Sequence, residues 1–352
     1  MQKVIKSSDL KADLKNILAH LHHDKLFILT DSNSEKLCLP LIEDLEEIQS
    51  AGKIEIKAGD DNKNIESLAS IWSYLSQNGA TRHSLLISLG GGMITDIGGF
   101  AAATFKRGIK SVNIPTTLLG AVDAAVGGKT GINFDGLKNE VGAFAPAETV
   151  LIDSEFFKTL DHANFISGYA EMIKHGLISN ESVWAKLLTF DTNNIDYTIL
   201  KELVVESVAV KENIVEQDPF EKNIRKALNL GHTIGHAFES LSYTMGKPIQ
   251  HGFAVAWGTI CELYLSHKKC GFPKDKLRQT LIFVRENYGL FPFSCDEYEA
   301  LYELMKHDKK NESAERINFT LLEDIGKLSL NQTATKDEIF ESIDFLRESL
   351  GM

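Results

Sequence analysis

Short apolar runs alternate with amphipathic stretches along the first half of the chain. The apolar runs lie at Leu26–Thr30, Ile54–Lys57, Ser84–Leu89, Ser111–Ile114 and, less distinctly, Val150–Asp153. Between them, Ile65–Gln77 has the spacing of apolar residues that is typical of an amphipathic helix. Strands that alternate with helices predict a parallel sheet covered by helices on both faces.

The pattern changes near Phe165, where longer helical periodicities replace the short apolar runs. Helices are predicted within Gly168–Ile178, Ile199–Gln217, Ile224–Leu241 and Phe253–Lys268. The 352 residues exceed the size at which a single core usually keeps growing. We therefore expect an α/β domain over residues 1–160, an all-helical domain over residues 161–352, and a functional cleft between them.

Composition and charge narrow the class of protein. The four cysteines have neither the spacing of a zinc ribbon nor the density of a disulfide scaffold, and no apolar run is long enough to span a membrane. The N-terminus has no apolar signal core, so we expect a cytoplasmic protein without a membrane partner. The net charge of -12 argues against nucleic-acid binding. An anionic small substrate stays open, because exposed charges more than about 10 Å away are largely screened.

Two histidines four residues apart are the first candidate for chemistry. Asn229–Glu239 places His232, His236 and Glu239 on adjoining turns of one predicted helix, and His251 follows shortly downstream. Imidazole and carboxylate groups are suitable ligands for a divalent metal such as zinc. Packed core histidines with satisfied ring nitrogens are the alternative that these residues alone leave open.

The segment Leu89–Gly99 is rich in glycine, follows a predicted strand and opens a predicted helix. Glycines let the backbone approach a pyrophosphate, and a helix N-terminus supplies N–H groups to it. This is typical of a Rossmann-like dinucleotide site, although the glycine spacing differs from the usual one. A tight turn is the alternative, with Asp96 as a favourable first-turn charge.

Two further segments carry charged residues in apolar surroundings. Pro115–Asn133 is dense in small residues, yet it contains Asp123 and Lys129, for which a buried ion pair between two helices is the plain alternative to a functional site. Farther along, Glu171 and Lys174 are three residues apart, and such a pair taken alone is usually a surface ion pair.

Taken together and in order, these segments resemble the 3-dehydroquinate synthase family. The resemblance is carried by Gly90–Asp96, Phe105–Gly108, Pro115–Thr117, Asp123–Asn133, Lys138–Asn139, Ser167–Lys174, Arg225–His236, His251–Gly252 and Asp308–Lys310. It implies an α/β domain that binds NAD, a helical domain that carries a divalent metal, and a homodimer that works in the shikimate pathway.

Carried over residue by residue, the resemblance implies three metal ligands, Glu171, His232 and His251, with zinc or cobalt as the metal. It places His236 on the substrate side. The implied substrate contacts are Asp123, Lys129, Asn139, Lys174, Lys211, Arg225, Asn229 and Lys309, with Arg107 from the partner subunit. The implied cofactor contacts are Asp31, Asp60, Lys63, Gly91, Gly92, Asp96, Thr116, Thr117, Lys129, Lys138 and Thr159.

The substrate implied by the resemblance, 3-deoxy-D-arabino-heptulosonate 7-phosphate, carries a carboxylate and a phosphate, so its site needs several cations. Arginine can hold an oxyanion with two parallel donors, whereas lysines act as point charges. The implied lyase reaction oxidises the substrate with NAD, releases phosphate by β-elimination, returns the hydride and closes a carbocycle by an aldol step. Lys129 and His236 are candidates for the proton transfers.

Three alternatives stay open at this point. They are another sugar phosphate cyclase such as 2-deoxy-scyllo-inosose synthase, a polyol dehydrogenase of the glycerol dehydrogenase type, and an inactive nucleotide-binding scaffold. The combination of Asp123–Lys129 with Lys309–Lys310 favours dehydroquinate synthase among the cyclases. The chain departs from the usual family pattern at Leu160–Phe165, which includes the atypical stretch Asp161–Asn164, and at Phe253.

Overall fold

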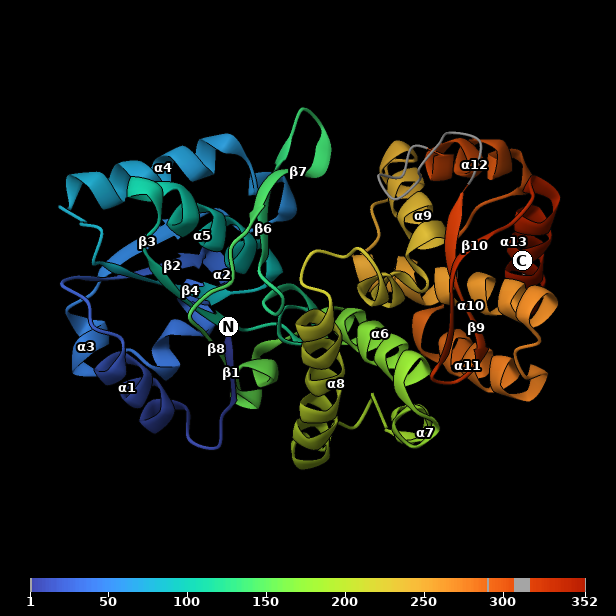
Figure 1. The fold of residues 1–352 in the computed structure, drawn as a ribbon, viewed down its shortest axis with the longest axis horizontal. Coiled ribbons are helices and arrows are strands. Elements are labelled where there is room, and N and C mark those ends of the chain that lie inside the picture. The colour runs from blue at the N-terminus through green and yellow to red at the C-terminus, as the bar shows by residue number, and fades with distance from the viewer. Residues whose placement is uncertain (1, 290, 307–316, 352) are drawn as a thin grey trace. The chain divides into compact units, whose positions relative to one another are not determined.

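The computed structural model describes residues 2–289, 291–306 and 317–351. The chain divides into two compact units, Met1–Asp161 and His162–Met352, which are drawn in Figure 1. Among the described residues, no helix combines the length and the apolar character that a membrane crossing requires.

A six-stranded parallel sheet forms the centre of the first unit, in the order β1-β8-β5-β4-β2-β3. Its strands are β1 (Lys3–Lys6), β2 (Leu26–Asp31), β3 (Gly52–Ile56), β4 (Leu85–Gly90), β5 (Lys110–Pro115) and β8 (Thr149–Ile152). Every strand of this sheet except β1 lies where the sequence predicted one. The short β1 was missed because it contains no fully buried position. Strands β2 and β4 are buried along their whole length, as expected for a sheet covered on both faces.

Helices connect these strands. They are α1 (Leu10–His20), α2 (Ser32–Leu37), α3 (Glu46–Gln49), α4 (Ile65–Gln77) and α5 (Gly92–Thr104). Short 3-10 segments lie at Leu39–Leu41, Asp60–Asn62, Phe105–Arg107 and Ser154–Thr159, and one π turn lies at Gly120–Ala124. Helix α4 occupies the predicted range, begins after Asn64, which accepts a hydrogen bond from the Ser67 amide, and buries Leu68, Ile71 and Leu75.

An antiparallel hairpin of β6 (Lys129–Phe134) and β7 (Leu137–Phe144) was not predicted. Its turn is Asp135-Gly136, and both residues have positive φ angles, 51° and 76°. Asp-Gly is the dipeptide that a two-residue hairpin turn favours, so the signal was present in the sequence. The hairpin exposes the large apolar side chains of Phe134, Leu137, Val141 and Phe144.

The second unit is mostly helical, as predicted. Its helices are α6 (His162–Ser179), α7 (Glu181–Thr189), α8 (Tyr197–Gln217), α9 (His232–Thr244), α10 (His251–Cys270), α11 (Lys274–Tyr288), α12 (Tyr298–Lys306) and α13 (Lys336–Leu350). Short 3-10 segments lie at Ile224–Asn229 and Cys295–Glu297.

The second unit differs from the prediction in two details. The expected continuous helix Ile224–Leu241 is wrong, because a 3-10 segment ends at Asn229 and α9 begins only after Gly231, whose φ is 79°. The unit is also not entirely helical, since β9 (Asn318–Asp324) and β10 (Lys327–Thr333) form an antiparallel hairpin. Strand β9 packs on α10 and buries Phe319–Leu322 in succession, so it shows no alternation of polar and apolar residues.

Helices α9 and α10 approach each other at the level of the backbone. A Cβ atom on Gly258 of α10 would overlap the Gly231 carbonyl oxygen and would lie 2.6 Å from the Gly235 nitrogen. A Cβ atom on Gly235 would lie 2.9 Å from the Ala254 oxygen. Glycine at these positions therefore sets the distance between the two helices.

We expect Gly258→Ala to lower the free energy of unfolding by about 1–3 kcal/mol, because the added methyl group must push α9 away from α10. Chemical denaturation measures the change. Ser240→Ala is the matched control on the exposed side of α9, with an expected effect within about 0.5 kcal/mol. Equal stability of the two variants would show that the helices do not depend on this close approach.

Candidate metal centre and cofactor site

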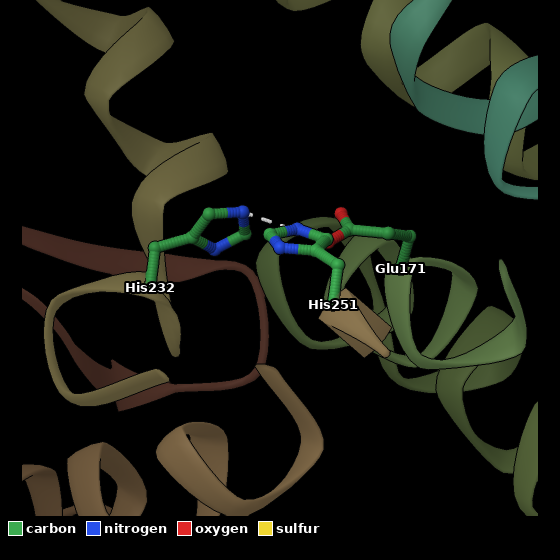
Figure 2. Close-up of side chains that lie close together, drawn as sticks. All are labelled: Glu171, His232 and His251. Carbon is green, nitrogen blue, oxygen red and sulfur yellow. Dashed lines mark ion pairs between the residues drawn. The ribbon is translucent and has the colours of Figure 1, made fainter. Parts of the chain in front are cut away.

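Three side chains from three helices point toward one another in the second unit. Figure 2 shows Glu171 of α6, His232 at the start of α9 and His251 at the start of α10. One ligand atom from each lies within 4.8 Å of the other two. The Nε2 atoms of both histidines are 3.5 Å from Oε1 of Glu171, whose side chain is fully buried. Two imidazoles and a carboxylate in this arrangement fit a divalent metal that keeps a further position open.

A second partner orients each imidazole. Nδ1 of His232 lies 3.1 Å from the carbonyl oxygen of Leu230, and Nδ1 of His251 lies 3.0 Å from Oε2 of Glu239. A carbonyl or carboxylate oxygen accepts, so both Nδ1 atoms donate and both Nε2 atoms can face a metal. Glu239 stands in the His232–Glu239 motif, but its contact with His251 was not predicted. Its place on the helix that carries His232 and His236 was the available signal.

His236 lies beside this centre without belonging to it. Its ring centroid is 5.3 Å from that of His232 and 5.9 Å from that of His251. The cluster of metal-ligating atoms found in the described residues contains His232 and His251 but not His236. The two histidines of α9 therefore occupy different positions relative to a metal. Ordinary core packing of histidines, the plain alternative, does not account for two Nε2 atoms that face one buried carboxylate.

The charges around the centre are closely coupled. Lys174 forms an ion pair with Glu171, and both side chains are buried, so the expectation of a surface ion pair is wrong. Burial lowers the pKa of His251, but hydrogen bonds with Glu171 and Glu239 outweigh it and raise this pKa to about 10. The two carboxylates thus favour positive charge at the place where the Nε2 atoms converge.

Three cationic residues that the resemblance assigned to the substrate are buried in the same unit. They are Lys174 on α6, Lys211 on α8 and Arg225 in the 3-10 segment Ile224–Asn229. These three elements pack against one another. Arg225 donates from Nη1 to the Pro219 oxygen at 2.6 Å, and Asn229 donates to Oε1 of Glu221 at 2.9 Å.

Asp218 holds the loop that leads to Arg225 and was not predicted. Its carboxylate accepts backbone N–H groups from Lys222, Asn223 and Arg225. Burial raises the pKa of Asp218, but these hydrogen bonds lower it below its ordinary value. The Asp218-Pro219 dipeptide, typical of a turn, was the signal available in the sequence.

In the first unit, predicted cofactor residues lie at the carboxyl ends of adjacent parallel strands. Asp31 ends β2, Gly91 and Gly92 follow β4, and Thr116 and Thr117 follow β5. The strand order reverses between β2 and β4, because β3 lies on one side of β2 and β4 on the other. Ligands of parallel α/β sheets bind outside the carboxyl ends at such a reversal. The N-terminus of α5 opens there, which suits an anionic group.

Cys38 connects several of these positions and was not predicted. This buried thiol lies 3.7 Å from Oγ1 of Thr159. Burial raises its pKa, the hydrogen bonds of Thr159 and Thr116 lower it, and the charge of Asp31 raises it further, with a net rise. Three predicted cofactor residues therefore surround one side chain.

A second group of predicted cofactor residues forms a hydrogen-bonded network. Lys63 is buried and donates from Nζ to Oδ2 of Asp96 and Oδ1 of Asn139, both at 2.5 Å. Asp96 is not in the first turn of α5, so its role as a first-turn charge is wrong. Asn139 was predicted to contact the substrate, but it is hydrogen-bonded to Lys63, one of the predicted cofactor residues. Close by, Lys138 is 3.3 Å from Oδ2 of Asp60.

The remaining predicted residues have diverse settings. Asp123 is half-buried in the π turn Gly120–Ala124, a feature that is frequent at functional sites. Lys129 is exposed at the start of β6, so a buried ion pair between two helices is wrong. Arg107 is exposed and has a φ of 68°, which is uncommon outside glycine. Lys309 lies outside the described residues.

The atypical positions fit their surroundings. Phe253 packs against Trp257 and Tyr288, with ring centroids 6.1 Å and 5.4 Å away. Asn164 accepts a hydrogen bond from Gln250, the residue before His251. The unusual residues therefore support the start of α10.

The fold is similar to that of solved sugar phosphate cyclases. It is similar to a solved 2-deoxy-scyllo-inosose synthase complexed with carbaglucose-6-phosphate, NAD+ and Co2+, with a TM-score of 0.84 and 20% identity over 99% of this chain and 96% of that chain. It is also similar to 2-epi-5-epi-valiolone synthase from Streptomyces hygroscopicus with NAD+ and Zn2+ bound, with a TM-score of 0.82 and 24% identity over 99% and 97% of the two chains.

Within that class, the chain belongs to the 3-dehydroquinate synthase family. The model of the N-terminal part of 3-dehydroquinate synthase matches residues 53–167, and the model of the C-terminal part matches residues 168–311. The chain is 58% identical over 351 residues to 3-dehydroquinate synthase from Parabacteroides distasonis, which covers 100% of this chain and 99% of that relative. The family resemblance drawn from the motifs is thereby confirmed.

Exchanging each histidine of α9 for alanine tests the geometry of the centre. We expect His232→Ala to reduce the bound metal to less than about a tenth, because it removes one of three ligands, whereas His236→Ala keeps the metal. Elemental analysis of the dialysed proteins measures the content. Loss of metal from His236→Ala alone would reverse the assignment of the two histidines.

Proposed function

We propose that this protein is a 3-dehydroquinate synthase that converts 3-deoxy-D-arabino-heptulosonate 7-phosphate to 3-dehydroquinate and phosphate. The observation that carries the proposal is the convergence of Glu171, His232 and His251 in a unit that also buries the cations Lys174, Lys211 and Arg225. Membership of the family supplies the reaction that this combination of groups suits.

A divalent metal, zinc or cobalt, fits the three-residue centre. The donor set of two imidazole nitrogens and one carboxylate oxygen is common for catalytic zinc, where substrate or water takes a further position. Glu239 and the Leu230 carbonyl hold the two rings with Nε2 toward the centre. Lys174 offsets the charge of Glu171, so the carboxylate is already compensated before a substrate arrives.

NAD fits the carboxyl edge of the sheet in the first unit. Asp31, Gly91, Gly92, Thr116 and Thr117 lie where the strand order reverses, at the start of α5. The network of Lys63, Asp96 and Asn139, with Asp60 and Lys138 beside it, supplies further polar groups. Thr159 belongs to the same set through Cys38.

The residues of the chain bind, orient and move protons in this reaction. NAD held at the carboxyl edge of the sheet would supply a hydride acceptor and donor for C5 of the substrate, and a metal held by Glu171, His232 and His251 would supply stabilisation of negative charge on the C5 oxygen. His236 lies next to the metal ligands, where it can exchange a proton with the substrate. Lys129 is a second candidate for proton transfer, and the phosphate of the substrate is a further base for the elimination.

Buried cations explain how an acidic protein selects an anionic substrate. Removing the charges of Lys174, Lys211 and Arg225 from water costs free energy. A bound anion or a fixed carboxylate nearby offsets this cost. Asp218 accepts the backbone N–H of Arg225, and the Pro219 oxygen accepts a hydrogen bond from its Nη1, so both the backbone and the guanidinium of this residue are held. We assign Asn229 and Asp123 to hydroxyl groups of the substrate, and Lys309 to its anionic groups.

The competing enzymes differ in chemistry rather than in architecture. Another sugar phosphate cyclase would act on a different sugar phosphate, and a polyol dehydrogenase would accumulate NADH. The set of buried cations exceeds what a neutral polyol requires. An inactive scaffold would not need to keep the three ligands together with Lys174.

A homodimer is part of the proposal, with Arg107 reaching the partner's active site. The β6–β7 hairpin leaves Phe134, Leu137, Val141 and Phe144 between 40% and 55% exposed. Exposed apolar clusters of this kind are typical of protein interfaces. We also expect the enzyme to act in the cytoplasm.

Purified protein incubated with the heptulosonate phosphate, NAD and zinc is expected to release phosphate without accumulating NADH, because the hydride returns to the substrate. A phosphate assay run with absorbance at the NADH band measures both. Removal of the metal with a chelator should abolish the release, and zinc should restore it. Steady NADH production would indicate a dehydrogenase, and no release would exclude this substrate.

The double substitution Phe134→Ser and Phe144→Ser is expected to weaken the dimer at least about tenfold, since it removes two apolar side chains from the proposed interface. Sedimentation over a range of concentrations measures the dissociation. Phe220→Ser, which changes an exposed phenylalanine of the other unit, is the matched control. A hairpin variant that dimerises like this control would place the interface elsewhere.

A further inference from the structure

Glu262 is a buried carboxylate that none of the roles above uses. It lies on α10, the helix that His251 begins, and it is fully buried. Its Oε2 accepts the backbone N–H of Gly231 at 2.6 Å. Its Oε1 accepts the N–H groups of Thr233 at 3.1 Å and Ile234 at 3.3 Å. All three amides belong to the N-terminal end of α9.

These contacts replace a helix cap that the local sequence does not provide. The first N–H groups of a helix have no partner inside it, and a Ser, Thr, Asp or Asn at the N-cap usually accepts one of them. The N-cap of α9 is Gly231, which has no side chain to do so. A carboxylate suits this position, because the N-terminus of a helix carries partial positive charge and hydrogen bonds to an ionised acceptor are strong.

Close packing of α9 on α10 brings the carboxylate of Glu262 within hydrogen-bonding distance of the first amides of α9. Gly258 lies one turn before Glu262 on α10 and touches the backbone of Gly231 and Gly235. A Cβ atom on Gly231 would lie 2.9 Å from the Val255 oxygen. The first turn of α9 therefore rests directly on α10, with the carboxylate of Glu262 at its end.

We propose that Glu262 is a positioning residue for the metal centre. His232 is the first residue of α9 and lies between Gly231 and Thr233, whose amides Glu262 holds. Fixing these amides fixes the direction in which the imidazole of His232 leaves the helix. Because Glu262 and His251 share α10, one carboxylate couples the helices that carry two of the three ligands. The inference rests on the proposed function only in requiring that the centre bind a metal.

Glu262→Gln tests the coupling, because it keeps the size of the side chain but replaces one accepting oxygen with an NH2 group. We expect about tenfold to a hundredfold weaker binding of Co2+, the range typical for partners that orient metal ligands. The visible absorption of bound Co2+ should also change, because the direction of His232 changes. Amide exchange of Gly231, Thr233 and Ile234 should become faster.

Glu338→Gln is the matched control. Glu338 accepts the Thr335 amide at the start of α13, so it is also a carboxylate at a helix N-terminus, but it lies outside the metal centre. This variant should be less stable and yet bind Co2+ with the affinity and absorption of the unmodified protein. If Glu262→Gln behaves in the same way, Glu262 only stabilises the helix and the proposal is wrong.

Exchange in the unmodified protein keeps the proposal testable if Glu262→Gln does not fold. Coupling is reciprocal, so Co2+ should slow exchange at Gly231, Thr233 and Ile234 more than at the Glu338 amide, which lies in the first turn of α13. Equal slowing at both helix ends would overturn the proposal. Failure of the unmodified protein to bind Co2+ would instead contradict the metal centre of the proposed function.

Discussion

The carboxylate of Glu171 is the constraint on which the second unit depends. A fully buried negative charge is stable only when nearby groups compensate it. Lys174 does so from the next turn of the same helix, and His232 and His251 approach from two other helices. His232 and His251 are the first residues of α9 and α10, so the same arrangement that surrounds the carboxylate creates a metal centre.

The packing of α9 on α10 turns this local requirement into a defined geometry. Gly231, Gly235 and Gly258 let the two backbones touch, and Glu262 closes the contact at the N-terminus of α9. Glu239 then holds His251 from α9, so the two helices support each other's ligands. His251 is thus oriented by a side chain of the neighbouring helix and His232 by the carbonyl of Leu230 just before its own helix, which limits the freedom of both rings before a metal binds.

The two units differ in the groups that they offer to an anionic ligand. The first unit offers the carboxyl edge of a parallel sheet and the N-terminus of α5, where backbone N–H groups suit a pyrophosphate. The second unit contains buried side-chain cations. One of them, Arg225, is held by its backbone N–H, which donates to the carboxylate of Asp218. In the proposed function an acidic protein binds two anions, because only charges close to each site matter there.

The sequence alone determined every strand of the sheet except β1, and it determined the extent of α4, because the spacing of apolar residues is a local property. The order of the motifs along the chain determined the family. The histidine motif drew attention to Glu239, and Asp218-Pro219 is typical of a turn, but which groups these carboxylates contact depends on tertiary packing. No local pattern links Glu262 to the start of α9. The sequence pattern also missed β9, whose buried residues do not alternate. The separate places of His232 and His236 followed from the resemblance, but only the tertiary structure shows the reason. The buried carboxylate of Glu171 lies 3.5 Å from the Nε2 atoms of His232 and His251, and packing of α6 against the rest of the unit determines where that carboxylate lies.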